Sequence, residues 1–238
     1  MNQSFTLCIA TESLEQDAQL LGVTTDDLQR IDIKVIADII NQPVLQLRLT
    51  YQITLPSHVL ASQLAWPVWQ QARVKFTDYL WEETCLECFI TGSSISGKES
   101  TIRQQTAPYI EVNASPDGRY ALYKFKGYRN PATLPPTPLY DTDGLTRVAI
   151  NWSDSVSQPE TSIKSELSLV NSSYQYERRF SIPITELPNH KYSVANITVE
   201  QIHPCVILQF GEHSLYFASQ HASPPDFHNH DYWSKFKL

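Results

Sequence analysis

The feature that most constrains this chain is a series of short stretches in which apolar and polar residues alternate. From Ile31 to Ile39 every second residue is apolar, which is the period of a half-buried β-strand. After the turn Asn41-Gln42-Pro43, alternation at 44–51 predicts the second strand of a hairpin. Further strands are predicted at 80–90, 108–114, 119–126, 145–151, 174–182, 205–210 and 214–219.

This spacing, without a strong amphipathic helix between the strands, favours an all-β fold, an antiparallel β-sandwich or barrel. A short helical segment is predicted within residues 11–28, where Thr24 and Thr25 precede Asp26 and Asp27 as at a helix start. Loops are predicted at 91–107, 130–144 and 153–165. With no internal repeat or linker, residues 1–238 are expected to form a single domain with its core at about 30–238.

Charge and composition exclude several classes of protein. The formal net charge of −7 opposes binding to nucleic acid, which needs clustered Lys and Arg. No apolar run approaches the roughly 20 residues of a membrane span. The N-terminus has no basic region, and Cys8 and Thr11 interrupt its apolar residues, so no signal peptide is predicted. The four cysteines do not suggest a disulfide framework, and a cytoplasmic protein is expected.

Cys85 and Cys88 have the CxxC spacing of zinc and redox sites. Here the pair falls within a predicted strand, where residues three apart point to opposite faces. Such thiols are not expected to share a metal or form an easy disulfide.

Two predicted strands place acidic and aromatic side chains together. In 80–90 one face carries Trp81, Glu83, Cys85, Glu87 and Phe89, and the other face, mostly apolar in its C-terminal half, is expected to face the core. In 108–114 Tyr109, Glu111 and Asn113 share a face. If these strands are neighbours, their polar faces merge.

Aromatic rings beside carboxylates and amides suit a neutral, hydroxyl-rich ligand, because a ring stacks on the sugar's C–H face while polar groups bind its hydroxyls. Trp81 and Tyr123 would stack. The predicted ligand-binding set is Trp81, Glu83, Glu87, Glu111, Asn113, Tyr123, Tyr128 and Arg129. The alternative is a structural network in which Arg129 neutralises Glu87 or Glu111.

Catalysis has little support in the sequence, and no enzyme is predicted. No GxSxG or P-loop motif is present, and the seven glycines do not cluster. A glycoside-active enzyme using Glu87 and Glu111 as acid and base stays open as an alternative.

Histidines gather near the C-terminus. One hypothesis is a metal or haem site formed by His221, Asp226 and His228, with His230 in reserve. No HExxH motif supports it. The other hypothesis is an ordered segment, 221–238, docked through its aromatic rings, since burying each ring contributes about 1.5–3 kcal/mol.

The sequence resembles the stand-alone bacterial DOMON-like proteins, which are similar to family-nine carbohydrate-binding modules. Three segments carry the resemblance: LWEETCLECFI, YIEVNASPDGRYALYKFKGYR and SLYFASQHASPPDFHNHDYW. The matching positions are Leu80-Trp81, Thr84-Cys85, Glu87, Glu111, Asn113, Ser115-Pro116, Gly118, Tyr123, Tyr128-Arg129 and Pro225-Asp226-Phe227-His228. Leu86 and Ala114 depart from the family, which has an aromatic residue and phenylalanine there. The resemblance spans about residues 30 to 238.

This resemblance implies a jelly-roll-like β-sandwich with a ligand site on one sheet or at its edge. Relatives bind sugars or haem, so haem is the alternative to a small-molecule or glycan ligand. Haem-binding relatives commonly use a methionine ligand, and the only methionine here is Met1. A Met/His haem is therefore excluded, whereas a bis-His site using His221 and His228 stays open.

Overall fold

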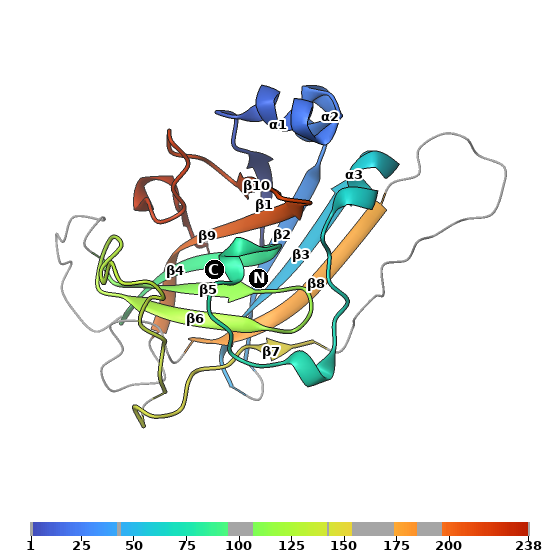
Figure 1. Cartoon of the computed structure of the whole chain (residues 1–238). Coiled ribbons are helices and arrows are strands. Elements are labelled where there is room, and N and C mark those ends of the chain that lie inside the picture. Colours follow the sequence, from blue (N-terminus) through green and yellow to red (C-terminus); the bar gives the residue numbers. More distant parts are fainter. Residues whose placement is uncertain are drawn as a thin grey trace.

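The computed structural model describes residues 2–41, 44–94, 107–141, 143–153, 174–184 and 197–237. These residues are mostly β, and they form one large antiparallel sheet that curls around the core (Figure 1). The strands hydrogen-bond in the order β6-β5-β4-β9-β10-β1-β2-β3-β8-β7, and β11 pairs with β9. Their bounds are β1 Asn2–Ile9, β2 Asp32–Ile40, β3 Gln46–Leu55, β4 Cys85–Ser94, β5 Tyr109–Ala114, β6 Tyr120–Phe125, β7 Asn151–Trp152, β8 Tyr174–Pro183, β9 Ile197–Phe210, β10 His213–Ala218 and β11 Ser234–Lys235.

Strand β1 joins the two halves of the sheet. Its residues from Asn2 to Leu7 pair with β2, whereas Cys8 and Ile9 pair with β10. Phe5, Leu7 and Ile9 are buried, so the core begins before the predicted residue 30.

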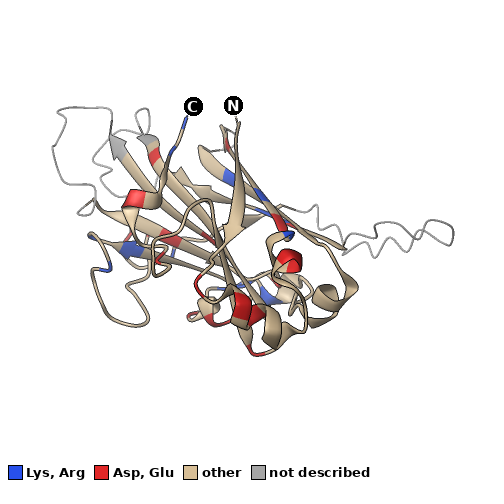
Figure 2. Ribbon diagram, turned by 90° about the horizontal axis from the view of Figure 1, so that it is seen from above, with Lys and Arg blue, Asp and Glu red and all other residues tan. Residues whose placement is uncertain are grey.

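Among the described residues, three short α-helices lie outside the sheet: α1 (Leu14–Leu21), α2 (Thr25–Gln29) and α3 (His58–Gln63). The predicted helix start is confirmed, because the Thr24 hydroxyl accepts from the Asp27 backbone N–H at 3.1 Å and the Asp27 carboxylate accepts from the Thr24 backbone N–H at 3.0 Å. The first turns of α1 and α2 carry acidic residues (Figure 2). No helix in the described part of the chain is long and apolar enough to span a membrane.

The main core lies inside the curled sheet, and the period-two pattern explains which residues belong to it. Leu86, Cys88 and Ile90 of β4 belong to it, whereas Cys85 and Phe89 belong to a second cluster on the other face. The prediction that Cys85 and Cys88 point to opposite faces is therefore confirmed, and both are free thiols.

Several predicted boundaries were wrong. Residues 80–84 are not strand: Tyr79 has a left-handed backbone with φ of 62°, and Leu80–Glu82 form a 3-10 turn (η2) that puts Leu80 in the second cluster. Most of 145–151 is loop, since β7 is Asn151–Trp152, and the predicted loop from 91 begins as strand up to Ser94. The predicted loops at 95–106 and 154–165 lie outside the described residues.

The expectation of an antiparallel, β-rich fold with a short N-terminal helical region is confirmed. The hydrogen bonds do not separate the strands into two sheets, because β1 makes the sheet continuous. The predicted jelly-roll sandwich stays a prediction.

Candidate functional site

Four neighbouring strands place polar and aromatic side chains on the face of the sheet opposite the main core. The register sets Glu87 of β4 against Asn113 of β5, and Phe89 against Glu111. Glu111 in turn lies opposite Tyr123 of β6. We call this the polar face: His203, Cys205, Cys85, Glu87, Phe89, Tyr109, Glu111, Asn113 and Tyr123. Residues opposite each other in a ladder point to the same side, so strand pairing alone brings the two acids and the amide together.

The polar groups of this face are buried and only partly paired. Glu87, Glu111 and Asn113 are 3%, 5% and 0% exposed. The Asn113 amide donates to Glu111 at 2.7 Å, but its Oδ1 has no hydrogen-bond partner among the described residues. A buried acceptor without a partner costs free energy, so such an atom points to a missing water or ligand.

Burial also changes the ionisation of the acids. The pKa of Glu111 rises from 4.5 to about 7 because the carboxyl is removed from water, an effect that the Asn113 hydrogen bond and the charge of Arg129 oppose. The pKa of Glu87 is raised well above its ordinary value, first by burial and then by nearby Glu111. Near pH 7 the polar face therefore carries little negative charge and offers hydroxyl donors as well as oxygen acceptors.

The C-terminal segment 221–237 covers the part of this face around Phe89, Tyr109 and Glu111. The Phe89 ring lies 4.9 Å from His228 and 5.8 Å from Trp233, centroid to centroid. The Tyr109 hydroxyl lies 2.7 Å from His228 Nδ1. The prediction that the segment is ordered and docked through aromatic rings is confirmed for residues 221–237.

One ion pair fixes the start of this cover. Asp226 accepts from Arg129 at 2.7 Å and from the Tyr128 hydroxyl at 2.5 Å, and its Oδ1 caps the backbone N–H of His228 at 3.1 Å. Arg129 has a positive φ of 46°, and its backbone N–H donates to the Tyr109 hydroxyl at 3.2 Å. The segment is thus tied to the turn after β6.

The remaining predicted residues lie around Tyr123. Trp81 packs edge-on against the Tyr123 ring at 5.9 Å, and the Tyr123 hydroxyl donates to Asp78 at 2.8 Å. Glu83 pairs instead with Arg119 at 2.7 Å. The left-handed Tyr79 turns this segment so that Trp81 reaches the second cluster.

The structure brings Glu87, Glu111, Asn113, Tyr123 and Trp81 together, but as an interior rather than an open cleft. Arg129 does not form the predicted ion pair with Glu87 or Glu111. Its ion pair is with Asp226, which is remote in sequence. Glu111 is instead held by the Asn113 amide.

The predicted metal ligands do not form a cluster. His221 bonds to the Cys8 carbonyl oxygen at 2.8 Å, His228 to Tyr109, and Asp226 to Arg129. Burial lowers the pKa of His228 to about 3, so its 3.7 Å approach to Glu111 is not an ion pair near neutral pH. Over the described ranges, no group of three His, Cys, Asp or Glu residues could hold a metal ion.

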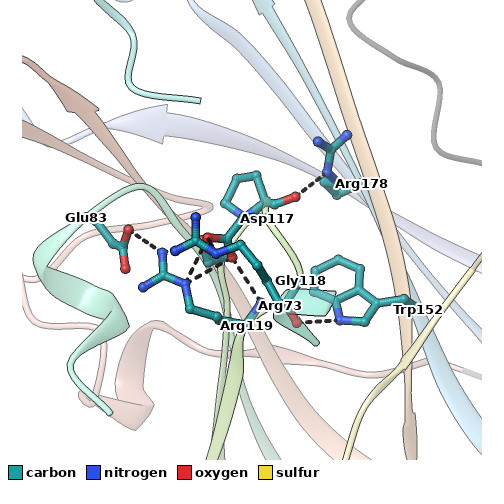
Figure 3. A network of polar contacts seen from close by, with 9 residues as sticks. Arg73, Glu83, Asp117, Gly118, Arg119, Trp152 and Arg178 are labelled. Atoms are coloured by element: carbon teal, nitrogen blue, oxygen red, sulfur yellow. Dashed lines mark hydrogen bonds and ion pairs between the residues drawn. The ribbon is translucent and has the colours of Figure 1, made fainter. Parts of the chain in front are cut away.

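Sequence reasoning missed a polar network at the turn between β5 and β6 (Figure 3). The fully buried Asp117 carboxylate accepts from Arg119 at 2.8 Å and pairs with Arg73 at 3.2 Å. Arg178 donates to the Pro116 carbonyl oxygen at 2.8 Å, and Trp152 to that of Gly118 at 3.0 Å. The partners of the Ser115-Pro116-Asp117-Gly118 turn come from distant segments of the chain.

No family model matches the sequence, and no curated protein is significantly similar to it. Among solved structures, the chain is similar to a protein from Bacteroides uniformis ATCC 8492 that is provisionally described as carbohydrate-binding. The TM-score is 0.47 and the identity 13%, over 98% of this chain and 84% of that chain. So distant a likeness leaves the DOMON resemblance a prediction.

Proposed function

We propose that this chain is a non-catalytic binding protein for a carbohydrate or a similar polyhydroxylated ligand, and that the polar face is its binding site. One observation supports this proposal above the others. The protein surrounds Glu87, Glu111 and Asn113 with aromatic rings and still leaves the Asn113 Oδ1 without a partner among the described residues. A ligand hydroxyl would supply the missing donor.

The chemistry of the face suits hydroxyl groups rather than ions. With pKa values raised by burial, Glu87 and Glu111 present protonated and ionised oxygens near neutral pH, so the pair can both donate to and accept from a hydroxyl. Trp81 and Tyr123 add ring surface for the C–H face of a sugar.

Access to these groups needs a segment that covers them to move, because Glu87, Glu111 and Asn113 are at most 5% exposed. Segment 221–237 covers the Glu111 end of the face, where His228 lies 3.7 Å from the Glu111 carboxylate. Tyr128 is 47% exposed and belongs to the Asp226 ion-pair group at the edge of the cover, where such movement would begin. The proposed ligand therefore replaces part of the cover.

The proposal assigns no catalytic role because of where Glu87 and Glu111 lie. Both carboxyls are buried on adjacent strands, and Glu111 accepts a hydrogen bond from Asn113 on the same sheet face. Acid–base cleavage of a glycosidic bond needs carboxyls placed on either side of that bond. The DOMON-like sandwich and a cytoplasmic location belong to the same proposal.

Calorimetric titration with mono- and oligosaccharides, guided by a glycan array, tests the function. Trp81→Ala and Asn113→Ala should each weaken binding about tenfold, which corresponds to about 1.4 kcal/mol. Tyr140→Ala removes an exposed aromatic ring that does not belong to the polar face, and it should leave binding unchanged. Circular dichroism establishes that each variant is folded.

The proposal fails if folded wild-type protein binds no sugar at millimolar concentration. It also fails if both site variants keep the wild-type affinity.

A further inference from the structure

A hollow of about 440 Å³ lies beside the turn between β5 and β6, and it is distinct from the polar face. Its lining residues are Ala72, Arg73, Lys75, Phe76, Thr77 and Arg119. The Phe76 ring forms part of the wall and packs edge-on against Tyr123 at 6.0 Å, so Phe76 separates the hollow from the polar face. The volume is within the range of about 300–1,000 Å³ typical of small-molecule pockets.

The charge of this hollow is opposite to that of the molecule. Three of its lining residues, Arg73, Lys75 and Arg119, are cationic, and none is acidic, in a chain of net charge −7. Arg147 does not line the hollow but lies near its wall, with its guanidinium 4.2 Å from the centre of the Phe76 ring. Within the described ranges, no carboxylate lies within ion-pair distance of Lys75.

Two carboxylates position the cations without neutralising all of them. The fully buried Asp117 is shared by Arg73 and Arg119, and Glu83 holds a second nitrogen of Arg119 at 2.7 Å (Figure 3). The Arg119 side chain is only 16% exposed and is therefore fixed in place. Arg73 is 46% exposed and remains accessible from solvent. Preorganised guanidinium groups in a partly desolvated hollow favour oxyanions.

We infer that this hollow binds the carboxylate or phosphate group of a small anionic molecule, at a site separate from the one proposed for a neutral polyhydroxylated ligand. Arg119 provides the rigid floor, whereas Arg73 and Lys75 close on the anion from the exposed side.

Calorimetric titration at low salt and at 0.15 M salt tests this site with four probes: glucose 6-phosphate, glucuronate, glucose and inorganic phosphate. The double variant Arg73→Gln/Lys75→Gln should weaken binding of the anionic probes at least tenfold. The control Arg30→Gln/Lys34→Gln removes the same charge from exposed residues of the α2–β2 region, and it should weaken binding less than twofold.

Comparing glucose 6-phosphate with inorganic phosphate shows whether the site takes an organic anion or a free oxyanion. Glucose 6-phosphate binding much more tightly than inorganic phosphate supports a site for an organic anion, and equal affinities support a site for a free oxyanion. Three outcomes overturn the inference: no anionic probe binds, glucose binds as tightly as the anions, or the two double variants weaken binding equally. Trp81→Ala should leave anion binding intact, so this site and the polar face can fail independently.

Discussion

At the scale of single residues, Glu111 shows most directly how the fold changes chemistry. Its carboxyl would have a pKa of 4.5 in water, and burial raises that pKa to about 7. Between these two values the folded protein holds a proton that the unfolded chain releases. The contribution of Glu111 to the free energy of unfolding is therefore fully present below about pH 4.5, and it is lost as pH rises through about 7.

We predict that Glu111→Gln removes this dependence. The difference in free energy of unfolding between wild type and variant should fall by about 3 kcal/mol as pH rises from 4.5 to 8. Urea denaturation across this range measures it. Burial lowers the pKa values of His203 and His228, so these residues raise the free energy of unfolding as pH rises. Both are present in wild type and variant, so their contributions cancel in the difference between the two proteins.

Exposed Glu212 provides the control, since Glu212→Gln should leave the profile unchanged. Parallel pH profiles for wild type and Glu111→Gln would show that Glu111 has an ordinary pKa.

The sequence predicted part of this residue-scale picture. Period-two alternation is a local property, so it was enough to place Glu87 and Phe89, and then Glu111 and Asn113, on shared faces. Alternation could not predict the partner of Arg129, because Asp226 lies 97 residues away and the contact depends on the path of the whole C-terminal segment.

At the scale of elements, the segment 221–237 acts as the cover of the second hydrophobic cluster. Trp233 is its anchor, at 6% exposed, with its ring 5.3 Å from Tyr109 and its indole N–H donating to the Phe227 carbonyl oxygen at 2.9 Å. The strand β11 then adds two residues to the ladder of β9.

We predict that Trp233→Ala lowers the free energy of unfolding by about 3–5 kcal/mol, because it leaves a cavity against Phe89 and Tyr109. For a chain of this size the melting temperature should fall by roughly 10 °C. Deleting 224–238 should cause a similar loss or aggregation.

Differential scanning calorimetry measures both changes. Leu145→Ala, at a position 84% exposed, should stay within about 0.5 kcal/mol of wild type. A Trp233→Ala protein that melts at the wild-type temperature would mean that the cover contributes nothing to stability.

Element boundaries were predictable where a strand keeps its alternation. The predictions failed where the backbone turns. The hairpin of β2 and β3 was found because its pattern is regular. Residues 80–84 also alternate, yet the left-handed Tyr79 and the η2 turn remove them from the strand. Strand β1 was missed although Phe5, Leu7 and Ile9 carry the same signal.

At the scale of the whole molecule, a single core connects the two halves of the sheet. Ile33 and Leu49 come from the half around β2 and β3, and Val112 and Val206 come from the half around β4 and β9, yet all four belong to one buried cluster. Strand β1 adds hydrogen bonds to both halves. Neither half can therefore open without exposing apolar surface of the other.

We predict that the two halves unfold in one cooperative transition. Hydrogen exchange followed by mass spectrometry should give the same opening free energy for peptides from β2–β3 and from β4–β5, equal to the global value from urea denaturation. Deleting residues 1–9 removes the shared strand and should lower both values together. If one half exchanged at a markedly lower free energy than the other, or if the deletion destabilised only one of them, the halves would be separate folding units and the single core would not couple them.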